Sequence, residues 1–226
     1  MSRFSGESAA VGSLKIASIP LALGSAFLGL VLAFAIKYPC TTHGWDGYQY
    51  SHLCYNDLQP LYYVRGISRG LVPYRDVQVE YPPLTGSFMD LSGRVLRAIP
   101  LESVFPNNDQ GYFRLSALLL APFAFAVTML LRKNVAAPRL MLWTLGTPTL
   151  LYSFHNWDLI AVAGLAWGLN RFELRRHASS GVGLALGASA KLFPAFAVPA
   201  IFASYLTHHI KRRASVRFLV ALIVTT

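Results

Sequence analysis

Four charged side chains stand inside or beside apolar stretches of this sequence: Asp57, Glu80, Asp158 and Lys191. Charged groups in apolar surroundings are costly, and each is a candidate for function for that reason. A carboxylate held where water meets lipid can act as a general base, and an ammonium group can bind a phosphate. Together they would suit a transfer in which one substrate is deprotonated and another is held by its phosphate.

Asp57 lies in Cys-Tyr-Asn-Asp-Leu-Gln-Pro-Leu-Tyr-Tyr at 54–63, shortly after the first apolar run. As a general base it would accept the proton of a substrate hydroxyl group. The alternative is a structural role, because Asn56 or Asp57 also suits the N-cap of a helix over 58–68 that stops before Gly70. The spacing favours neither interpretation.

Glu80 and Tyr81 precede Pro82 and Pro83. Residues before a proline avoid the helical conformation, so we expect 74–83 to be extended. A segment stiffened in this way can hold Glu80 and Tyr81 against a polar substrate. The alternative is a rigid turn that binds nothing.

Asn156, Trp157 and Asp158 combine an amide, an indole and a carboxylate, a grouping that is common in sugar sites. We expect Asn156 and Asp158 to bind substrate. The alternative role for Asp158 is to cap the helix that follows it.

Lys191 interrupts the apolar run 181–206, between small residues and Pro194. A proline frees backbone groups and the ammonium group adds a charge, so this position can bind a phosphate. The alternative is that the side chain extends to a membrane interface. No spacing of His, Cys, Asp or Glu indicates a metal site, and we expect neither metal nor cofactor.

The composition indicates the solvent in which these groups act. Of the 226 residues 54% are hydrophobic and only 13% charged, and the mean hydropathy is +0.43. This is about half the charge of an average soluble domain, which points to lipid. The net charge of +10 lies in short clusters between apolar runs, so we expect no nucleic-acid partner.

Apolar runs of sufficient length to cross a bilayer occupy 16–36 and 115–131, and shorter ones occupy 140–154 and 159–169. A further run begins near Val216 and continues to Thr226, so we expect the chain to be the N-terminal portion of a longer protein. The sequence therefore predicts an all-α integral membrane protein, a polytopic helical bundle that forms one transmembrane domain over 1–226.

Basic clusters mark the cytoplasmic ends of membrane helices and place the N-terminus in the cytoplasm. The segment 38–113 then lies outside the cell membrane and is too aromatic and apolar to be disordered. Within it, apolar residues recur at helical spacing over 84–99, which predicts an amphipathic helix in the membrane interface. The clusters are Arg132, Lys133 and Arg139; Arg171, Arg175 and Arg176; Lys211, Arg212 and Arg213.

Three details of this topology bear on the candidate residues. The arms 140–154 and 159–169 are short, so their connecting tip should sink Asn156 and Asp158 into the protein. The run 181–206 has basic residues on both sides, which favours a broken hairpin that returns to the cytoplasmic face over a single crossing. Cys40 and Cys54 can form a disulfide in an oxidising compartment, with two buried thiols as the alternative.

At these same residues the chain resembles the GT-C class of polyprenyl-phosphate-sugar-dependent glycosyltransferases. Within that class it is similar to glycosyltransferase family 87, typified by actinobacterial α-mannosyltransferases of envelope lipoglycans. Four motifs carry the resemblance, in the family's order: Cys-Tyr-Asn-Asp-Leu at 54–58 with Tyr62, Pro-Tyr-Arg-Asp at 73–76 leading to Glu-Tyr-Pro-Pro-Leu at 80–84, Asn-Trp-Asp-Leu at 156–159, and Gly187 through Lys-Leu-Phe-Pro at 191–194.

The resemblance implies that Asp57 deprotonates an acceptor hydroxyl group, which attacks the anomeric carbon with inversion while polyprenyl phosphate leaves. It also implies that Lys191 lies near the donor phosphate. The implied partners are a polyprenyl-phosphate sugar donor, a lipid or glycan acceptor, and membrane lipids. The family's typical members imply that the sugar is mannose. Two alternatives stay open: a transporter or lipid-binding membrane protein, and an inactive truncated remnant.

Overall fold

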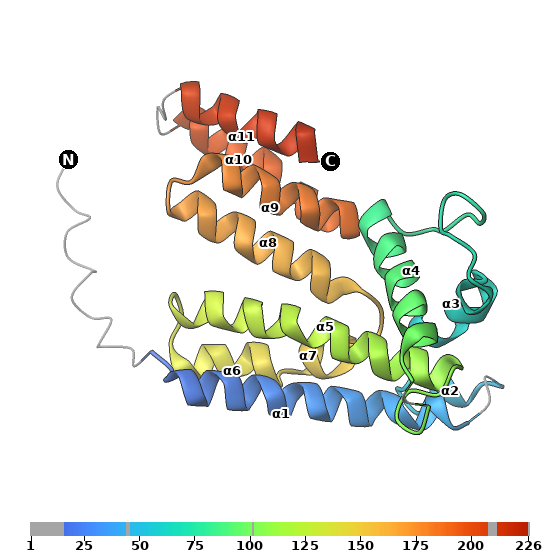
Figure 1. Cartoon of the computed structure of the whole chain (residues 1–226). Helices are drawn as coiled ribbons and strands as arrows, with labels where there is room; N and C mark the ends of the chain where they lie inside the picture. Colours follow the sequence, from blue (N-terminus) through green and yellow to red (C-terminus); the bar gives the residue numbers. More distant parts are fainter. Residues whose placement is uncertain (1–15, 44–45, 101, 208–211, 226) are drawn as a thin grey trace.

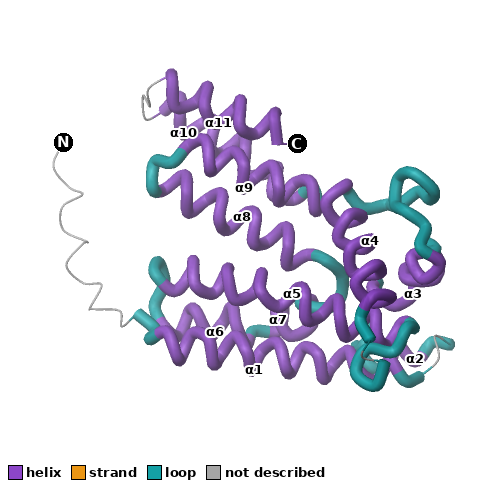
Figure 2. Tube along the Cα trace, in the orientation of Figure 1, coloured by secondary structure: helices purple, strands orange, loops and turns teal. Residues whose placement is uncertain are grey.

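The computed structural model describes residues 16–43, 46–100, 102–207 and 212–225, and every regular element in these ranges is a helix (Figure 2). Extended pairing within them is limited to two isolated bridges, Ile16 with Ala136 and Pro73 with Val77. The expected all-helical fold class is therefore confirmed for the part of the chain that the structure describes.

The long helices lie side by side in one array, and a further helix crosses its end (Figure 1). Neighbours in the array are α1 (Ile19–Lys37), α5 (Asp109–Arg132), α8 (Asp158–Glu173), α9 (His177–Ala190) and α11 (Arg212–Thr225). The crossing helix is α4 (Pro83–Ala98), which contacts α5 and α9. We call this end the α4 end. The opposite end, with the turn after α5 and the α8–α9 turn, we call the basic end.

Among the described residues, two helices are long and apolar enough to cross a membrane. One is the continuous span Ile19–Thr41 of 23 residues, formed by α1 and the 3-10 turn η1 (Tyr38–Thr41), and the other is α5 with 24 residues. At 1.5 Å per residue, α5 is about 36 Å long, against about 30 Å of hydrocarbon in a bilayer. α5 begins at Asp109, so the segment outside the array ends earlier than the expected 113.

The apolar run 140–154 forms two short helices, α6 (Ala137–Leu145) and α7 (Thr147–Tyr152). The break falls at Gly146, where the backbone is extended, directly before a helix that has Pro148 in its first turn. Proline has no N–H to donate to the preceding turn, which is why one helix cannot run through this position.

The run 181–206 also breaks, and the chain turns back as a hairpin. α9 ends at Ala190, Lys191 is extended, and a 3-10 turn η3 (Phe193–Phe196) leads into α10 (Ala197–Thr207). The Tyr205 hydroxyl lies 2.8 Å from Nδ1 of His177, so the end of α10 meets the start of α9. This is the expected hairpin, and it places both of its ends at the basic end of the array.

Glycines allow α8 and α9 to approach unusually closely. Gly164 and Gly168 face Gly187 and Gly183, and a Cβ atom added to Gly164 would lie 2.6 Å from the Gly187 Cα. A Cβ on Gly183 would lie 2.8 Å from the Gly168 Cα. We call these four glycines the glycine seam. Small residues four apart on both helices are typical of helix pairs packed in lipid.

The region between α1 and α5 folds onto the α4 end. α3 (Leu58–Val64) is shorter than the expected helix over 58–68, because Gly66 adopts a left-handed conformation with φ 65°. The residues beyond it form a separate 3-10 turn, η2 (Ile67–Arg69), which ends at Gly70 as expected. The core joins this region to the array, as in the stacked rings of Tyr62 and Tyr112, whose centroids lie 4.5 Å apart.

The expectation that 74–83 is extended throughout is wrong at its start. Tyr74–Asp76 form a turn, with φ of Tyr74 at 65° and the bridge between Pro73 and Val77 beneath it. Asp76 stabilises the turn by accepting a 2.9 Å hydrogen bond from the Val72 N–H. The arginine beside it and this N–H hold the pKa of Asp76 at about 2.

α4 packs a face of small residues and most of its apolar stripe against the rest of the protein. Thr85, Gly86, Ser92 and Gly93 are buried, whereas Leu91 on the predicted stripe is 53% exposed. The small face permits close contact with the Tyr74 ring and with Ile67. The other stripe residues, Leu84, Phe88, Val95 and Ile99, are partly buried against the core, so most of the stripe faces the array and Leu91 is its exposed member.

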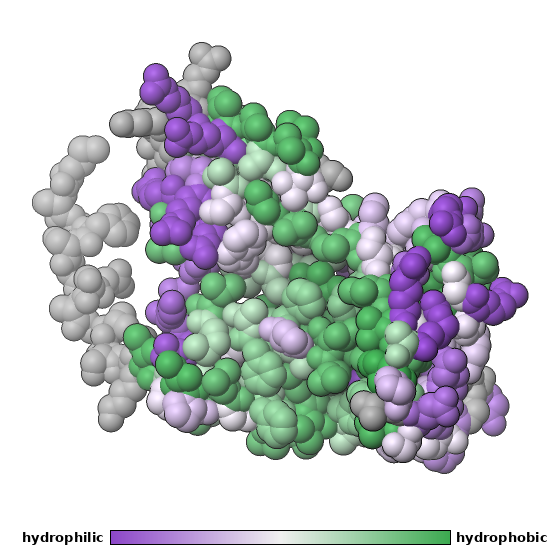
Figure 3. All heavy atoms as spheres, viewed as in Figure 1, coloured by the Kyte–Doolittle hydropathy of each residue, from purple (hydrophilic) through white to green (hydrophobic). Residues whose placement is uncertain are grey.

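The surface follows the same division. Figure 3 shows apolar residues across the middle of the visible face and hydrophilic residues gathered toward its two ends. Large exposed apolar side chains of α1 contribute to the apolar surface, among them Phe27, Leu28 and Val31. An apolar belt between polar ends is unusual for a monomer in water.

Candidate functional site

Asp57 does not cap α3. The capping oxygen belongs to Asn56, whose Oδ1 accepts a 3.0 Å hydrogen bond from the Gln59 N–H, while the Asp57 side chain makes no capping bond. Asn56 is fully buried and also donates to the Gln59 side chain at 2.9 Å. The capping role, which was the alternative interpretation of Asp57, is therefore filled by Asn56.

The Asp57 carboxylate accepts a hydrogen bond from a tyrosine on each of its oxygens. The Tyr55 hydroxyl donates to Oδ1 at 2.8 Å and the Tyr81 hydroxyl donates to Oδ2 at 2.5 Å. Burial, and then the carboxylate itself, raises the pKa of Tyr55 to about 12 and moves the pKa of Tyr81 in the same direction. Both phenols thus remain donors at neutral pH, and they fix the orientation of a half-buried carboxylate.

The backbone of Asp57 is held by the loop between α7 and α8. Its N–H donates a 2.7 Å hydrogen bond to the His155 carbonyl, and the rings of Tyr55 and His155 have centroids 5.2 Å apart. Burial, and then the charge of Lys37, lowers the pKa of His155. The imidazole beside Asp57 is therefore uncharged at pH 7.

Lys37 supports the same segment from the end of α1. It is almost fully buried, and its ammonium group donates to the carbonyl oxygens of Leu53 and Tyr55 at 3.1 and 2.7 Å. The sequence analysis missed this residue. A lysine that ends an apolar helix directly before a Tyr-Pro pair was the available signal.

Cys40 and Cys54 form a disulfide with their Cα atoms 5.5 Å apart. It ties η1, which follows α1, to the residue directly before Tyr55. Lys37 and the disulfide together attach the segment that carries Asp57 to the end of α1.

Lys191 and Asp158 form an ion pair at the start of α8, with side chains 37% and 25% exposed. The carbonyl of Ala190 accepts a 2.8 Å hydrogen bond from the buried Thr85 hydroxyl, which holds the extended residue Lys191 against α4. Asn156 is buried and its Oδ1 accepts the Asp158 N–H at 2.9 Å, so its side chain forms the turn into α8.

Tyr81 and Trp157 join these two groups. Their rings meet edge to face with centroids 5.3 Å apart, and Trp157 directly precedes Asp158. The charge of Asp158 also contributes to the raised pKa of Tyr81. The structure thus brings Asp57, Tyr81, Asp158 and Lys191 together from four segments that are far apart in the sequence. We call these residues the carboxylate–lysine cluster.

Glu80 belongs to a different contact. Its carboxylate pairs with Arg65 at 2.7 Å and is 47% exposed. Tyr81 rather than Glu80 reaches Asp57, because the two neighbours point in different directions from the bend before Pro82.

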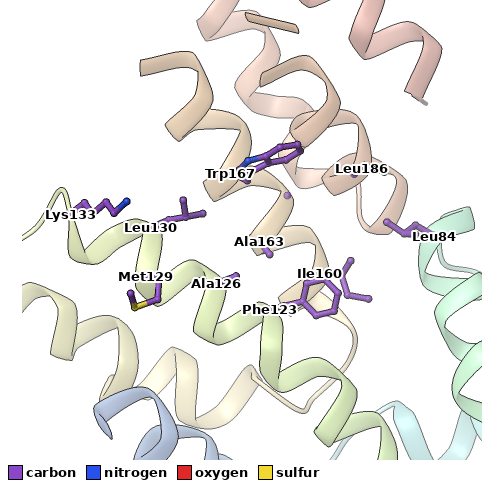
Figure 4. Close-up of a pocket in the computed structure, with 11 residues that line it drawn as sticks. Leu84, Phe123, Ala126, Met129, Leu130, Lys133, Ile160, Ala163, Trp167 and Leu186 are labelled. Carbon is purple, nitrogen blue, oxygen red and sulfur yellow. The ribbon is translucent and has the colours of Figure 1, made fainter. Parts of the chain in front are cut away.

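Two cavities lie close to the cluster, and a cluster residue lines one of them. One of about 200 Å³ is lined by Asp158 together with Trp143, Thr149 and Phe193. The other is an apolar groove of about 500 Å³ between α5 on one side and α8 and α9 on the other (Figure 4). It extends from Leu84 and Ile160 near the α4 end toward Lys133 and Trp167 near the basic end.

The described residues contain no group of three or more His, Cys, Asp or Glu side chains that could hold a metal ion. Comparison with protein-family models, with curated proteins and with solved structures finds no match to this chain.

Proposed function

We propose that the protein is a membrane glycosyltransferase that moves a sugar from a polyprenyl-phosphate donor to a lipid or glycan acceptor on the extracytoplasmic face. The observation that carries the proposal is the carboxylate–lysine cluster, which combines an oriented carboxylate with a cation at one end of an apolar helical array. The four motifs that suggested glycosyltransferase family 87 are the segments that meet there.

Several features support the membrane placement. α1 and α5 are long enough to cross a bilayer, and the glycine seam is a packing mode typical of lipid. The α5–α6 and α8–α9 turns carry basic residues at the end opposite to α4, as cytoplasmic loops do. The α4 end, with its disulfide, is then extracytoplasmic.

In the proposed reaction Asp57 accepts the proton of the acceptor hydroxyl group. The acceptor oxygen forms a bond to the anomeric carbon while the bond from that carbon to the phosphate oxygen breaks, so the configuration inverts and polyprenyl phosphate leaves with the electron pair. Tyr55 and Tyr81 hold the carboxylate in one orientation before the substrate arrives, which is the preorganisation that general-base catalysis requires.

Lys191 is the proposed ligand of the donor phosphate. Its ammonium group is partly exposed and is balanced by a single carboxylate, so a phosphate can approach it beside Asp158. The apolar groove between α5 and α8 has a volume of about 500 Å³ and would hold part of the isoprenoid chain. Leu84 places the groove's outer end beside the segment that carries Tyr81.

The test is sugar transfer by the Asp57→Asn variant, measured in membranes of cells that express the protein, with a radiolabelled polyprenyl-phosphate mannose as donor. We expect transfer to fall by about 100-fold or more, the usual scale for losing a general base. Asp90→Asn is the matched control, since Asp90 pairs with Arg94 on α4 and has no contact with the cluster.

Wild-type transfer by Asp57→Asn would remove the proposed base. Donor binding that depends on Lys191, without transfer by the wild-type protein, would instead favour the transporter or lipid-binding alternative. The intramembrane ion pair of Lys191 and Asp158 would then be a substrate path.

A further inference from the structure

A second polar pocket lies at the basic end, far from the carboxylate–lysine cluster along the array. It has a volume of about 530 Å³ and lies between the start of α9 and the first turns of α11. Its polar lining consists of Arg175, Arg176, His177, Ser179, Arg213 and Arg217.

Four guanidinium groups line this pocket and no carboxylate does. None of the four arginines belongs to an ion pair among the described residues, whereas Arg65, Arg94 and Lys191 at the α4 end each have an acidic partner. Like charges gathered in one concavity repel one another, and a bound anion would relieve that repulsion.

The backbone adds to the positive potential. α9 has 14 residues, and its N-cap residue Arg176 provides no side-chain cap, so the first N–H groups of the helix are left for another acceptor. Arg175, directly before it, is held at φ 55°, a conformation that costs free energy for a residue other than glycine. This turn places two consecutive arginines beside the exposed N–H groups.

One wall of the pocket is fixed. Nδ1 of His177 lies 2.8 Å from the Tyr205 hydroxyl, and the His177 ring also meets Phe172 edge to face. These contacts tie α9 to α8 and α10, so the pocket does not depend on the position of α11 alone.

We propose that this pocket binds the phosphate group of one anionic phospholipid from the cytoplasmic leaflet. Guanidinium groups pair with phosphate oxygens through two parallel hydrogen bonds, and basic pockets between membrane helices suit such headgroups. α11 favours a lipid over a free phosphate ion, because Val216, Val220 and Val224 are exposed and continue from the arginines as an apolar surface for acyl chains.

The site rests on the proposed membrane placement but not on the proposed transfer reaction. The test therefore measures lipid binding only. The full chain in a neutral detergent is titrated with dioctanoyl phosphatidylglycerol, with dioctanoyl phosphatidylcholine or with inorganic phosphate, and bound molecules are counted by native mass spectrometry. We expect one phosphatidylglycerol to bind more tightly than phosphatidylcholine, and inorganic phosphate to displace it poorly.

Substitutions locate the binding. Arg217→Gln should weaken phosphatidylglycerol binding about fivefold, and Arg213→Gln with Arg217→Gln about 25-fold. Arg139→Gln is the matched control, since Arg139 is an exposed arginine at the basic end outside the pocket, and it should bind as the wild type does.

Ala178→Glu provides a variant whose folding is not at risk. Ala178 is exposed in the first turn of α9, where a carboxylate is favourable for the helix, yet the new charge would occupy the pocket. We expect phosphatidylglycerol binding to be lost. Equal losses in Arg139→Gln and Arg217→Gln, unchanged binding by Ala178→Glu, or displacement of the lipid by an equal concentration of inorganic phosphate would each overturn the proposal.

Discussion

The two ends of the helical array treat their charged side chains in opposite ways. At the α4 end Asp57 accepts from two tyrosines, Lys191 pairs with Asp158, and Lys37 donates to two carbonyl groups. At the basic end the arginines around the start of α9 have no acidic partner in the pocket they line.

The difference suggests two different tasks. Partners that hold a charged group in one orientation prepare it for chemistry, where small displacements are costly. Cations without partners keep their full charge for an anion that arrives from outside. Changes at the α4 end should therefore affect geometry and stability, whereas changes at the basic end should affect binding alone.

The largest effect on stability should come from the disulfide. Cys40→Ser with Cys54→Ser removes a crosslink over a sequence separation of 14 residues. The chain-entropy model gives a loss of about 3 kcal/mol in the free energy of unfolding for a loop of this size. A thermal melt in detergent measures it, and unreduced wild-type protein should show no thiol that can be labelled. Labelling of either cysteine before reduction would contradict the presence of the disulfide.

Lys191→Met should weaken binding of polyprenyl phosphate by about tenfold or more, because a hydrogen-bonded charge on the phosphate is lost. Arg94→Met on α4 is the control, an exposed cation with its own acidic partner. Binding is measured by displacement of a fluorescent polyprenyl-phosphate analogue. Equal effects of the two variants would show that Lys191 acts only through general charge.

Asp57→Asn should also cost about 1 kcal/mol of unfolding free energy. An amide has one acceptor oxygen where the carboxylate has two, so either Tyr55 or Tyr81 loses its acceptor. Tyr81→Phe in the Asp57→Asn background should then add less than it does in the wild type. Strict additivity in this double-mutant cycle would contradict the shared network.

Alkaline pH tests the same network. The folded-state pKa of Tyr55 is raised to about 12 from an ordinary value of 10, so its contribution to stability is complete below pH 10 and is lost as the pH rises from 10 to 12. Thermal melts over this range should fall less steeply for Tyr55→Phe than for the wild type. Parallel slopes would show that the pKa of Tyr55 is not raised in the folded protein.

The smallest effect is expected at the basic end. Arg217→Gln should change the free energy of unfolding by less than about 0.5 kcal/mol in lipid-free detergent, since the side chain is exposed and unpaired with any acid in its pocket. Added phosphatidylglycerol should raise the melting temperature of the wild type more than that of the variant. A large loss of stability without lipid would make this arginine structural and weaken the contrast between the ends.

Much of the helical framework could be predicted, because period and hydropathy are local properties of the chain. The hairpin over 181–206 could be predicted from the basic residues on both sides of it. The helix end before Gly70 could be predicted from the conformational freedom of glycine. The helix over 58–68 was too long because nothing local shows that Gly66 would adopt φ 65°.

The candidate site was harder to predict, since its contacts join distant segments. The sequence named Asp57, Tyr81, Asp158 and Lys191, but it left Asp57 as a possible cap, and only the fold brings Tyr81 to its carboxylate. Lys37 and the basic pocket were missed. Arg175, Arg176 and Arg213 of the pocket were interpreted as marks of topology, which describes where a cation lies and not what surrounds it.

The close packing at the glycine seam also affects the distant ion pair of Asp158 and Lys191. α8 begins at Asp158 and α9 ends just before Lys191, so the register between these two helices decides how the ion pair meets. Gly164 lies about 9 Å along the axis from Asp158, yet one methyl group there would push α9 outward, because Gly187 already touches it. A conservative change such as Gly164→Ala can thus disturb the carboxylate–lysine cluster from a position outside it.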